Sequence, residues 1–218
     1  GDLVSALNGQ RQNINNPDCQ DPNPHQCNQY NPGDPNEIHG YTSDAGSKFI
    51  SDSVREVSYS IEFENDPKIA NASAHKIVVT NELDKNVFDL SSFMPTKIQI
   101  GDKTLELDGK KNFTHTIDMR PEINAIAQVD LDYNETEGVA TWTISSLDPM
   151  TMEETFDIMQ GVLPVNSNGN GIGFLSYSIG IRNQMDDGDT FSNSASITFD
   201  FEEPIETPVW TNTVDAIA

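Results

Sequence analysis

From residue 54 onward, apolar and polar side chains alternate with a period of two over several long stretches. In residues 57–63 every odd position is apolar, and every even position is Ser or Glu. Successive side chains of a β-strand point to opposite faces, so this alternation predicts strands with one buried face. The same pattern recurs at residues 125–133, 140–144, 175–181 and 191–201.

Turn-forming residues separate these predicted strands. Asn134–Gly138 predicts a hairpin between the strands on either side of it, and the acidic turn Asp186–Asp189 predicts a second hairpin. Gly101–Asp102 predicts a turn between two shorter strands. The shorter strands are predicted at residues 76–80, 97–100, 104–107 and 113–118.

One short helix is predicted at Met150–Met159. Asp148 would cap its start, and Met152, Phe156 and Met159 would share one face. Elsewhere, many short strands are joined by turns, and strands do not alternate with helices. This organisation predicts an all-β fold, an antiparallel β-sandwich of roughly 8–10 strands.

Residues 1–40 are rich in Asn, Gln and Pro and lack apolar periodicity, so they are predicted to be a linker or an extension draped over a domain at 41–218. Cys19 and Cys27, the two cysteines, suggest a local disulfide and hence an oxidising compartment. The alternative is a zinc site that adds His25 and His39, but the paired short Cys spacings of structural zinc modules are absent.

The chain is strongly acidic, with 35 Asp and Glu against 12 Lys and Arg and a formal net charge of -23. This charge would repel nucleic acids and anionic membrane surfaces, whereas divalent cations would relieve it. No stretch has the roughly 20 apolar residues that cross a bilayer, and no signal peptide opens the sequence. We therefore expect a secreted or cell-surface segment, monomeric and cut from a longer protein.

Five short segments follow one another in a specific order and spacing: Asp34–Ile38, Tyr59–Asp66, Ser146–Pro149, Thr198–Ile205 and Thr207–Thr213. Together they resemble immunoglobulin-like domains of unassigned function in large, multidomain bacterial surface and secreted proteins. The resemblance spans residues 34–215. It implies an immunoglobulin-like β-sandwich that acts as a spacer, stalk or part of an adhesin, and it implies no catalytic activity.

The sequence departs from this pattern at one point. Phe201 and Glu202 stand where the family often has Asn before its Glu-Pro pair. The departure adds one carboxylate, which puts a simple transfer of ligand roles in doubt.

If successive strands alternate in direction, several acidic loops leave the sandwich at the same end. Crowded carboxylates are costly unless a cation joins them, and calcium takes six to eight oxygen ligands with flexible geometry. We therefore predict a structural calcium site at this pole, although no contiguous EF-hand loop is present. Its ligands would come from Asp34, Asn36, Glu64, Asp66, Asp148, Asp200 and Glu203.

No Ser, Cys or His occurs in a known nucleophile motif, and the four histidines are scattered. We therefore expect a non-enzymatic structural or interaction module, whose partners would be neighbouring domains of the same chain. The alternative is a carbohydrate- or protein-binding, adhesin-type module that uses the pole loops or Trp210. Trp142, in an alternating stretch, is instead predicted to pack in the core.

Overall fold

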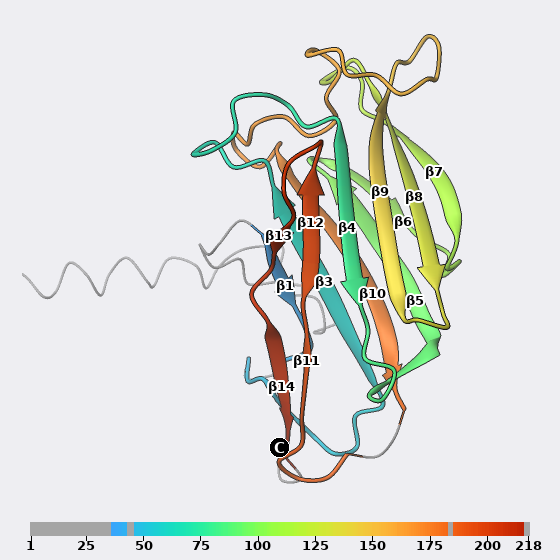
Figure 1. Ribbon diagram of the computed structural model, residues 1–218, viewed down its shortest axis with the longest axis vertical. Coiled ribbons are helices and arrows are strands. Elements are labelled where there is room, and N and C mark those ends of the chain that lie inside the picture. Colours follow the sequence, from blue (N-terminus) through green and yellow to red (C-terminus); the bar gives the residue numbers. More distant parts are fainter. Residues whose placement is uncertain (1–35, 43–45, 183–184, 216–218) are drawn as a thin grey trace, which may run out of the picture. The chain divides into compact units, whose positions relative to one another are not determined.

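The structure, a computed structural model, describes residues 36–42, 46–182 and 185–215 (Figure 1). The described part contains fourteen strands and no helix, and hence none long and apolar enough to cross a membrane. The strands are β1 Glu37–His39, β2 Phe49–Ile50, β3 Glu56–Glu64, β4 Lys76–Glu82, β5 Phe88–Ile100, β6 Lys103–Glu106, β7 Phe113–Asp118, β8 Ile126–Asn134, β9 Val139–Leu147, β10 Ile172–Ile181, β11 Thr190–Asn193, β12 Ala195–Phe199, β13 Ile205–Glu206 and β14 Trp210–Val214.

Two large sheets pack face to face. One has the order β1-β3-β10-β5-β6, and the other has the order β13-β12-β4-β9-β8-β7. The chain also contains a third sheet of three strands, in the order β11-β14-β2, in which β14 and β2 are parallel. The predicted antiparallel β-sandwich is therefore confirmed. It has more strands than expected because five of them are only two to four residues long.

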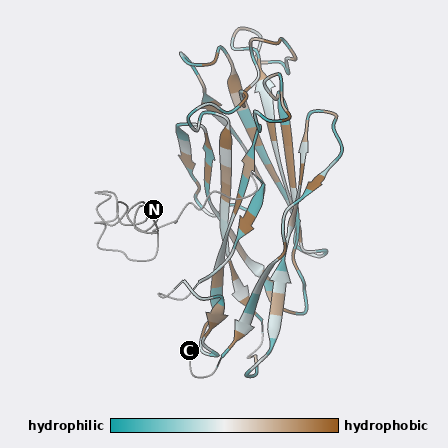
Figure 2. Ribbon diagram, turned by 90° about the vertical axis from the view of Figure 1, so that its left-hand side faces the viewer, coloured by the Kyte–Doolittle hydropathy of each residue, from teal (hydrophilic) through white to brown (hydrophobic). Residues whose placement is uncertain are grey.

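The alternation in the sequence becomes the core between the sheets, as the colour changes along the strands in Figure 2 illustrate. The odd-numbered residues of β3 from Val57 to Phe63 are buried. Trp142 of β9 packs against Tyr177 of β10 with ring centroids 5.9 Å apart, which confirms its predicted core position. Phe93 of β5 stacks on Tyr133 of β8 at 4.2 Å. Aromatic rings from both sheets thus fill the middle of the sandwich.

A buried polar network lies within this core. The Tyr177 hydroxyl donates to Asn81 Oδ1 and accepts from Asn193 Nδ2. Asn81 Nδ2 in turn donates to Asn193 Oδ1, at 2.7 Å, and to the Ser194 carbonyl. Because these side chains are out of contact with water, each bond replaces hydration that burial removed.

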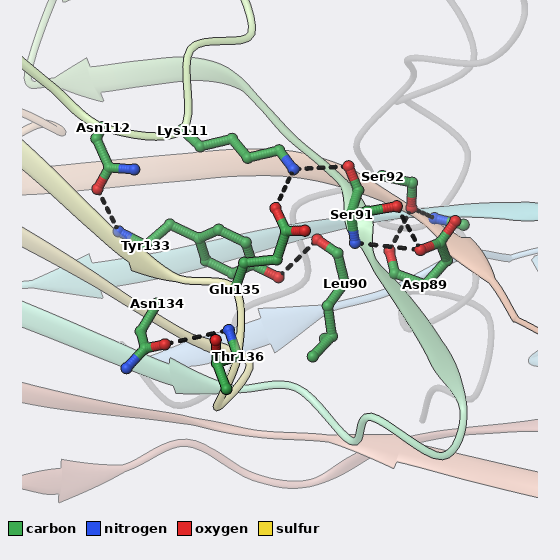
Figure 3. A network of polar contacts seen from close by, with 11 residues as sticks. Asp89, Leu90, Ser91, Ser92, Lys111, Asn112, Tyr133, Asn134, Glu135 and Thr136 are labelled. Carbon is green, nitrogen blue, oxygen red and sulfur yellow. Dashed lines mark hydrogen bonds and ion pairs between the residues drawn. The ribbon is translucent and has the colours of Figure 1, made fainter.

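A second network ties the two large sheets together where β8 turns into β9 (Figure 3). Lys111 Nζ, from the β6–β7 connection, donates to the Ser91 carbonyl of β5 at 2.6 Å and to Glu135 at 2.8 Å. The Tyr133 hydroxyl donates to the Leu90 carbonyl at 2.9 Å. The predicted turn at Asn134–Gly138 forms here, with Gly138 at a φ of 75°.

The predicted second hairpin is wrong. The turn at Asp186–Asp189 forms, but β10 pairs with β3 and β5, whereas β11 pairs with β14, and β12 pairs with β13 and β4. The turn therefore carries the chain from one sheet to the others. Local alternation sets which face is buried, but it leaves the pairing partner open.

The helix predicted at Met150–Met159 does not form. Asp148 accepts hydrogen bonds from the amides of Met150 and Thr151, as a helix cap would. Met152 then adopts a φ of 58°, and Glu154 forms an antiparallel bridge with Leu147. The segment thus folds back along the end of β9 instead of continuing into a helix.

The first strand, β1, lies within the range 1–40 and pairs with β3. Residues 1–35, which include Cys19, His25, Cys27 and Asp34, lie outside the described residues. The division at residue 40, the disulfide and the zinc alternative stay predictions.

Candidate functional site

The strands β3, β9 and β12 all end at the same end of the sandwich, at the top of Figure 1. Hydrogen bonds join these strand ends and the loops that follow them. Asn65 Nδ2 donates to the Leu163 carbonyl at 2.9 Å, and the Ser146 amide donates to the His75 carbonyl at 2.7 Å. This end carries most of the residues that the sequence proposed as calcium ligands.

Asp200 fastens the turn after β12 to the start of β4. Its Oδ1 accepts hydrogen bonds from the amides of His75 and Lys76, both at 2.8 Å, and its own amide donates to the Lys76 carbonyl. Asp200 has a φ of 49°, a left-handed conformation that Asp tolerates better than most residues. Its carboxylate therefore serves to position the loop.

Asp148 has a similar role after β9. Its Oδ1 accepts from the amides of Met150 and Thr151, and its Oδ2 accepts from Gln160 Nε2 at 2.9 Å. The Gln160 amide group and these two backbone amides hold the pKa of Asp148 below its ordinary value, because they stabilise the ionised form. This carboxylate closes the turn that replaces the predicted helix.

The remaining proposed ligands are spread over the same end. Asn36 is buried and its Oδ1 accepts from the Glu64 amide at 3.4 Å, while Glu64 Oε1 accepts from Asn166 Nδ2 at 2.6 Å. Asp66 accepts from the Lys68 amide within its own turn. Glu203 is exposed on the connection between β12 and β13.

These side chains do not converge on a common point. Among the described residues, no group of three His, Cys, Asp or Glu side chains could hold a metal ion. Calcium requires six to eight oxygen ligands, and the Asp148 and Asp200 carboxylates already accept protein N–H groups. The described residues alone therefore do not fit a calcium ion, and the calcium site stays a prediction because Asp34 lies outside them.

Large apolar side chains are exposed at this same end. Phe156, from the β9–β10 connection, stacks on Phe201, from the β12–β13 turn, with ring centroids 5.6 Å apart. Phe156 is 52% exposed and Phe201 is 87% exposed. We call this surface the apolar pole, and it consists of Met150, Met152, Phe156, Ile158, Met159 and Phe201, all exposed.

The base of the apolar pole is held firmly. The His75 ring lies 5.7 Å from the Phe156 ring, and His75 Nε2 makes a 2.7 Å hydrogen bond with the Asp157 carbonyl. The Thr155 amide donates to the Ser146 carbonyl at the end of β9. The stacked phenylalanines are thus presented on loops that the sheet positions.

Sequence reasoning missed this surface. It placed Met152, Phe156 and Met159 on one face of a helix and placed Phe201 in a strand with one buried face. The available signal was the spacing of apolar residues among acids in residues 150–159, a spacing that a buried helix shares. Phe201 lies beyond the end of β12, in a turn.

Trp210, the other candidate surface residue, is surrounded by neighbours. Lys48 Nζ lies 3.8 Å from its ring centroid, and its Nε1 donates to Asn212 Oδ1 at 2.9 Å. The His39 ring meets it edge-on at 6.0 Å. At Gly40, a Cβ atom would lie 2.5 Å from the indole nitrogen. The indole thus joins β14 to the segments around β1 and β2.

The described histidines have contacts of their own. His75 binds the Asp157 carbonyl, His39 lies 3.1 Å from a Glu37 oxygen, and the His115 ring lies 5.0 Å from the Phe113 ring.

A hollow elsewhere on the described surface is open to solvent. It is lined by Glu82, Leu83, Asp84, Lys85, Asn86 and Glu137, from the β4–β5 turn and the β8–β9 turn.

Comparison with known proteins gives a partial match to one family of unknown function and several solved structures with a similar fold. Residues 140–213 match the model of a family described as a domain of unknown function, DUF7619. No curated protein matches the sequence.

Three similar solved structures come from bacterial surface proteins. The collagen-binding domain of a Staphylococcus aureus adhesin is 12% identical, with a TM-score of 0.43, and covers 84% of this chain and 98% of that domain. The N-terminal domain of the Streptococcus gordonii adhesin Sgo0707 is 10% identical (TM-score 0.43; 82% of this chain, 32% of that one). The group B streptococcus pilus 2b backbone protein is 16% identical (TM-score 0.45; 82% and 56%). At these identities no function extends from these proteins to this chain.

Proposed function

We propose that this chain is a non-catalytic interaction module of a bacterial cell-surface or secreted multidomain protein, and that it contacts a protein partner through the apolar pole. The exposed Phe156–Phe201 stack carries this proposal. Contiguous exposed apolar groups rimmed by polar residues mark protein interaction sites, whereas single exposed apolar residues need no explanation. Here five exposed apolar residues fall within ten residues of one connection, and Phe201 stacks on one of them, Phe156.

Burial of the apolar pole against a partner would supply a useful free energy. Removing a Phe or Met side chain from water contributes roughly 1.5–3 kcal/mol when burial is complete. Aromatic residues are also the side chains that most often dominate binding at interfaces, and methionine adapts to irregular partner surfaces. The hydrogen bonds that the Asp148 and Asp200 carboxylates accept hold the loops in place, which limits the entropy lost on binding.

Glycan binding through Trp210 is the second candidate that the sequence raised. Sugar-binding aromatic residues offer an open ring face. The neighbours of Trp210, namely Lys48, His39 and Gly40, favour a role in packing instead.

An array of extracellular proteins and glycans, probed with the purified chain, tests the two candidates together. We expect binding to one or more proteins that is lost in Phe156→Ser/Phe201→Ser and retained in Trp210→Phe. Binding to glycans that is lost only in Trp210→Phe would favour the second candidate. Binding that neither variant changes would contradict both. Thermal melting of each variant shows whether it has folded.

A further inference from the structure

The two segments that carry the apolar pole are rich in acidic side chains. The β9–β10 connection from Asp148 to Gln160 contains four acids and no Lys or Arg, and the segment from Phe199 to Glu206 also contains four acids and no Lys or Arg. The eight acids are Asp148, Glu153, Glu154, Asp157, Asp200, Glu202, Glu203 and Glu206.

Among the ion pairs of the described residues, one involves these eight acids. Lys76 Nζ lies 3.6 Å from Glu154 and balances one carboxylate. Glu153, Glu202 and Glu203 are exposed. The two segments of the apolar pole therefore combine exposed aromatic and methionine side chains with exposed carboxylates.

We propose that the partner is a cationic amphipathic protein segment, whose apolar side chains cover the Phe156–Phe201 stack while its Lys and Arg side chains meet the carboxylates of the same two segments. This inference rests on the proposed function, since it names the chemistry of the partner at the same surface. Charge complementarity steers such a partner to the apolar pole and selects against acidic competitors.

The same charges disfavour other occupants. A second copy would bring the same acidic segments against those of the first, because a symmetric dimer pairs the same patch on both subunits. An anionic lipid surface would be repelled for the same reason. Both are thus poorer fits to this surface than a basic protein segment.

A random-peptide display library provides a defined probe. Panning would use the wild-type chain and Phe156→Ser/Phe201→Ser in parallel, and both proteins would first be checked by thermal melting. We expect the peptides enriched on the wild type, but not on the variant, to combine Lys or Arg with Leu, Ile or aromatic residues.

The charge contribution is tested on the best of these peptides. Glu153→Gln/Glu202→Gln/Glu203→Gln should weaken its binding about tenfold, whereas a triple removing the same charge elsewhere, Glu82→Gln/Asp132→Asn/Glu137→Gln, should change it less than about twofold. Raising the ionic strength from about 0.15 M to about 1 M, which shortens the Debye length from about 8 to about 3 Å, should remove the difference between the triples.

The possible outcomes distinguish a failure of the cationic partner from a failure of the proposed function. If the peptides that depend on Phe156 and Phe201 are neutral or acidic, the cationic partner is overturned and the apolar pole remains the contact surface. Equal weakening by the two triples also overturns the cationic partner. If no peptide distinguishes the wild type from Phe156→Ser/Phe201→Ser, the proposed function itself fails, and this inference fails with it.

Discussion

Phe156 and Phe201 stack on each other at the surface, with ring centroids 5.6 Å apart, although they come from loops that follow strands in different parts of the sequence. Two aromatic rings that remain exposed after packing on each other contribute less to folding than buried ones. Their position at the end of a rigid sandwich instead suits contact with another molecule.

The buried network around Tyr177 should be important for stability. Asn81→Ala removes the acceptor of the Tyr177 hydroxyl and leaves Asn193 without its Asn81 donor. An unsatisfied buried polar group costs about 1–3 kcal/mol, so we expect a loss of about 2–3 kcal/mol in urea unfolding. The exposed control Asn86→Ala should lose less than about 1 kcal/mol. Equal losses would show that the network is dispensable.

The ring of Phe63, which pairs with Gly173 across β3 and β10, should leave no room for a side chain at residue 173. A Cβ atom at Gly173 would lie 2.2 Å from the Phe63 ring carbons. We expect Gly173→Ala to cost about 1–3 kcal/mol through overpacking. A double-mutant cycle with Phe63→Leu checks the cause, because the smaller side chain should relieve part of the loss. Strictly additive effects would rule out the contact.

Stability should depend on the ionisation of Glu62, which lies directly opposite Glu37 in the β1–β3 pairing. Burial, helped by the charges of Glu37 and Glu64, raises the pKa of Glu62 from 4.5 to about 7. Between these values the folded state binds more protons than the unfolded state, so stability falls as the pH rises and the loss is complete above about pH 7.

Glu62→Gln isolates this effect from the rest of the acidic surface. Relative to the wild type, the variant should gain stability when urea unfolding is moved from about pH 4.5 to about pH 8. Because Glu62 is only half-buried, solvent screening keeps the gain small. A difference between variant and wild type that is the same at both pH values would exclude the shift.

Calcium at the pole remains a prediction from the sequence, and melting curves test it. A calcium site would stabilise the folded chain by about 1.4 kcal/mol at a concentration ten times its Kd. A chelator should reverse this, and Asp34→Asn/Glu203→Gln should abolish the response. If the Tm of the wild-type chain changes with neither calcium nor chelator, the calcium site is refuted.

Much of the fold could be predicted because strand formation follows a local rule. Alternation identified β3, β8, β9 and β10 and the buried position of Trp142. Pairing is non-local, and a turn such as Asp186–Asp189 can join strands of one sheet or carry the chain to another. The second hairpin was therefore wrong: its first strand forms as β10, but its second, predicted at residues 191–201, is divided between β11 and β12 in different sheets.

The candidate site could be predicted only in part, for a related reason. Alternating strand directions were enough to place the acidic loops at one end. The atoms that each carboxylate binds depend on backbone amides of distant segments, such as those of His75 and Lys76 at Asp200. The exposure of Phe156 was not predictable either, because its spacing from Met152 and Met159 suits a buried helix face equally well.

The most direct test of the apolar pole is the Kd of one protein partner from the extracellular array for three forms of the chain. Phe156→Ser/Phe201→Ser should bind at least about tenfold more weakly than the wild type, a loss of about 1.4 kcal/mol. Phe49→Ser/Met94→Ser, which removes two exposed apolar side chains outside the apolar pole, should bind within about twofold of it. Equal affinities for all three forms, or equal losses in both variants, would contradict a contact at the apolar pole.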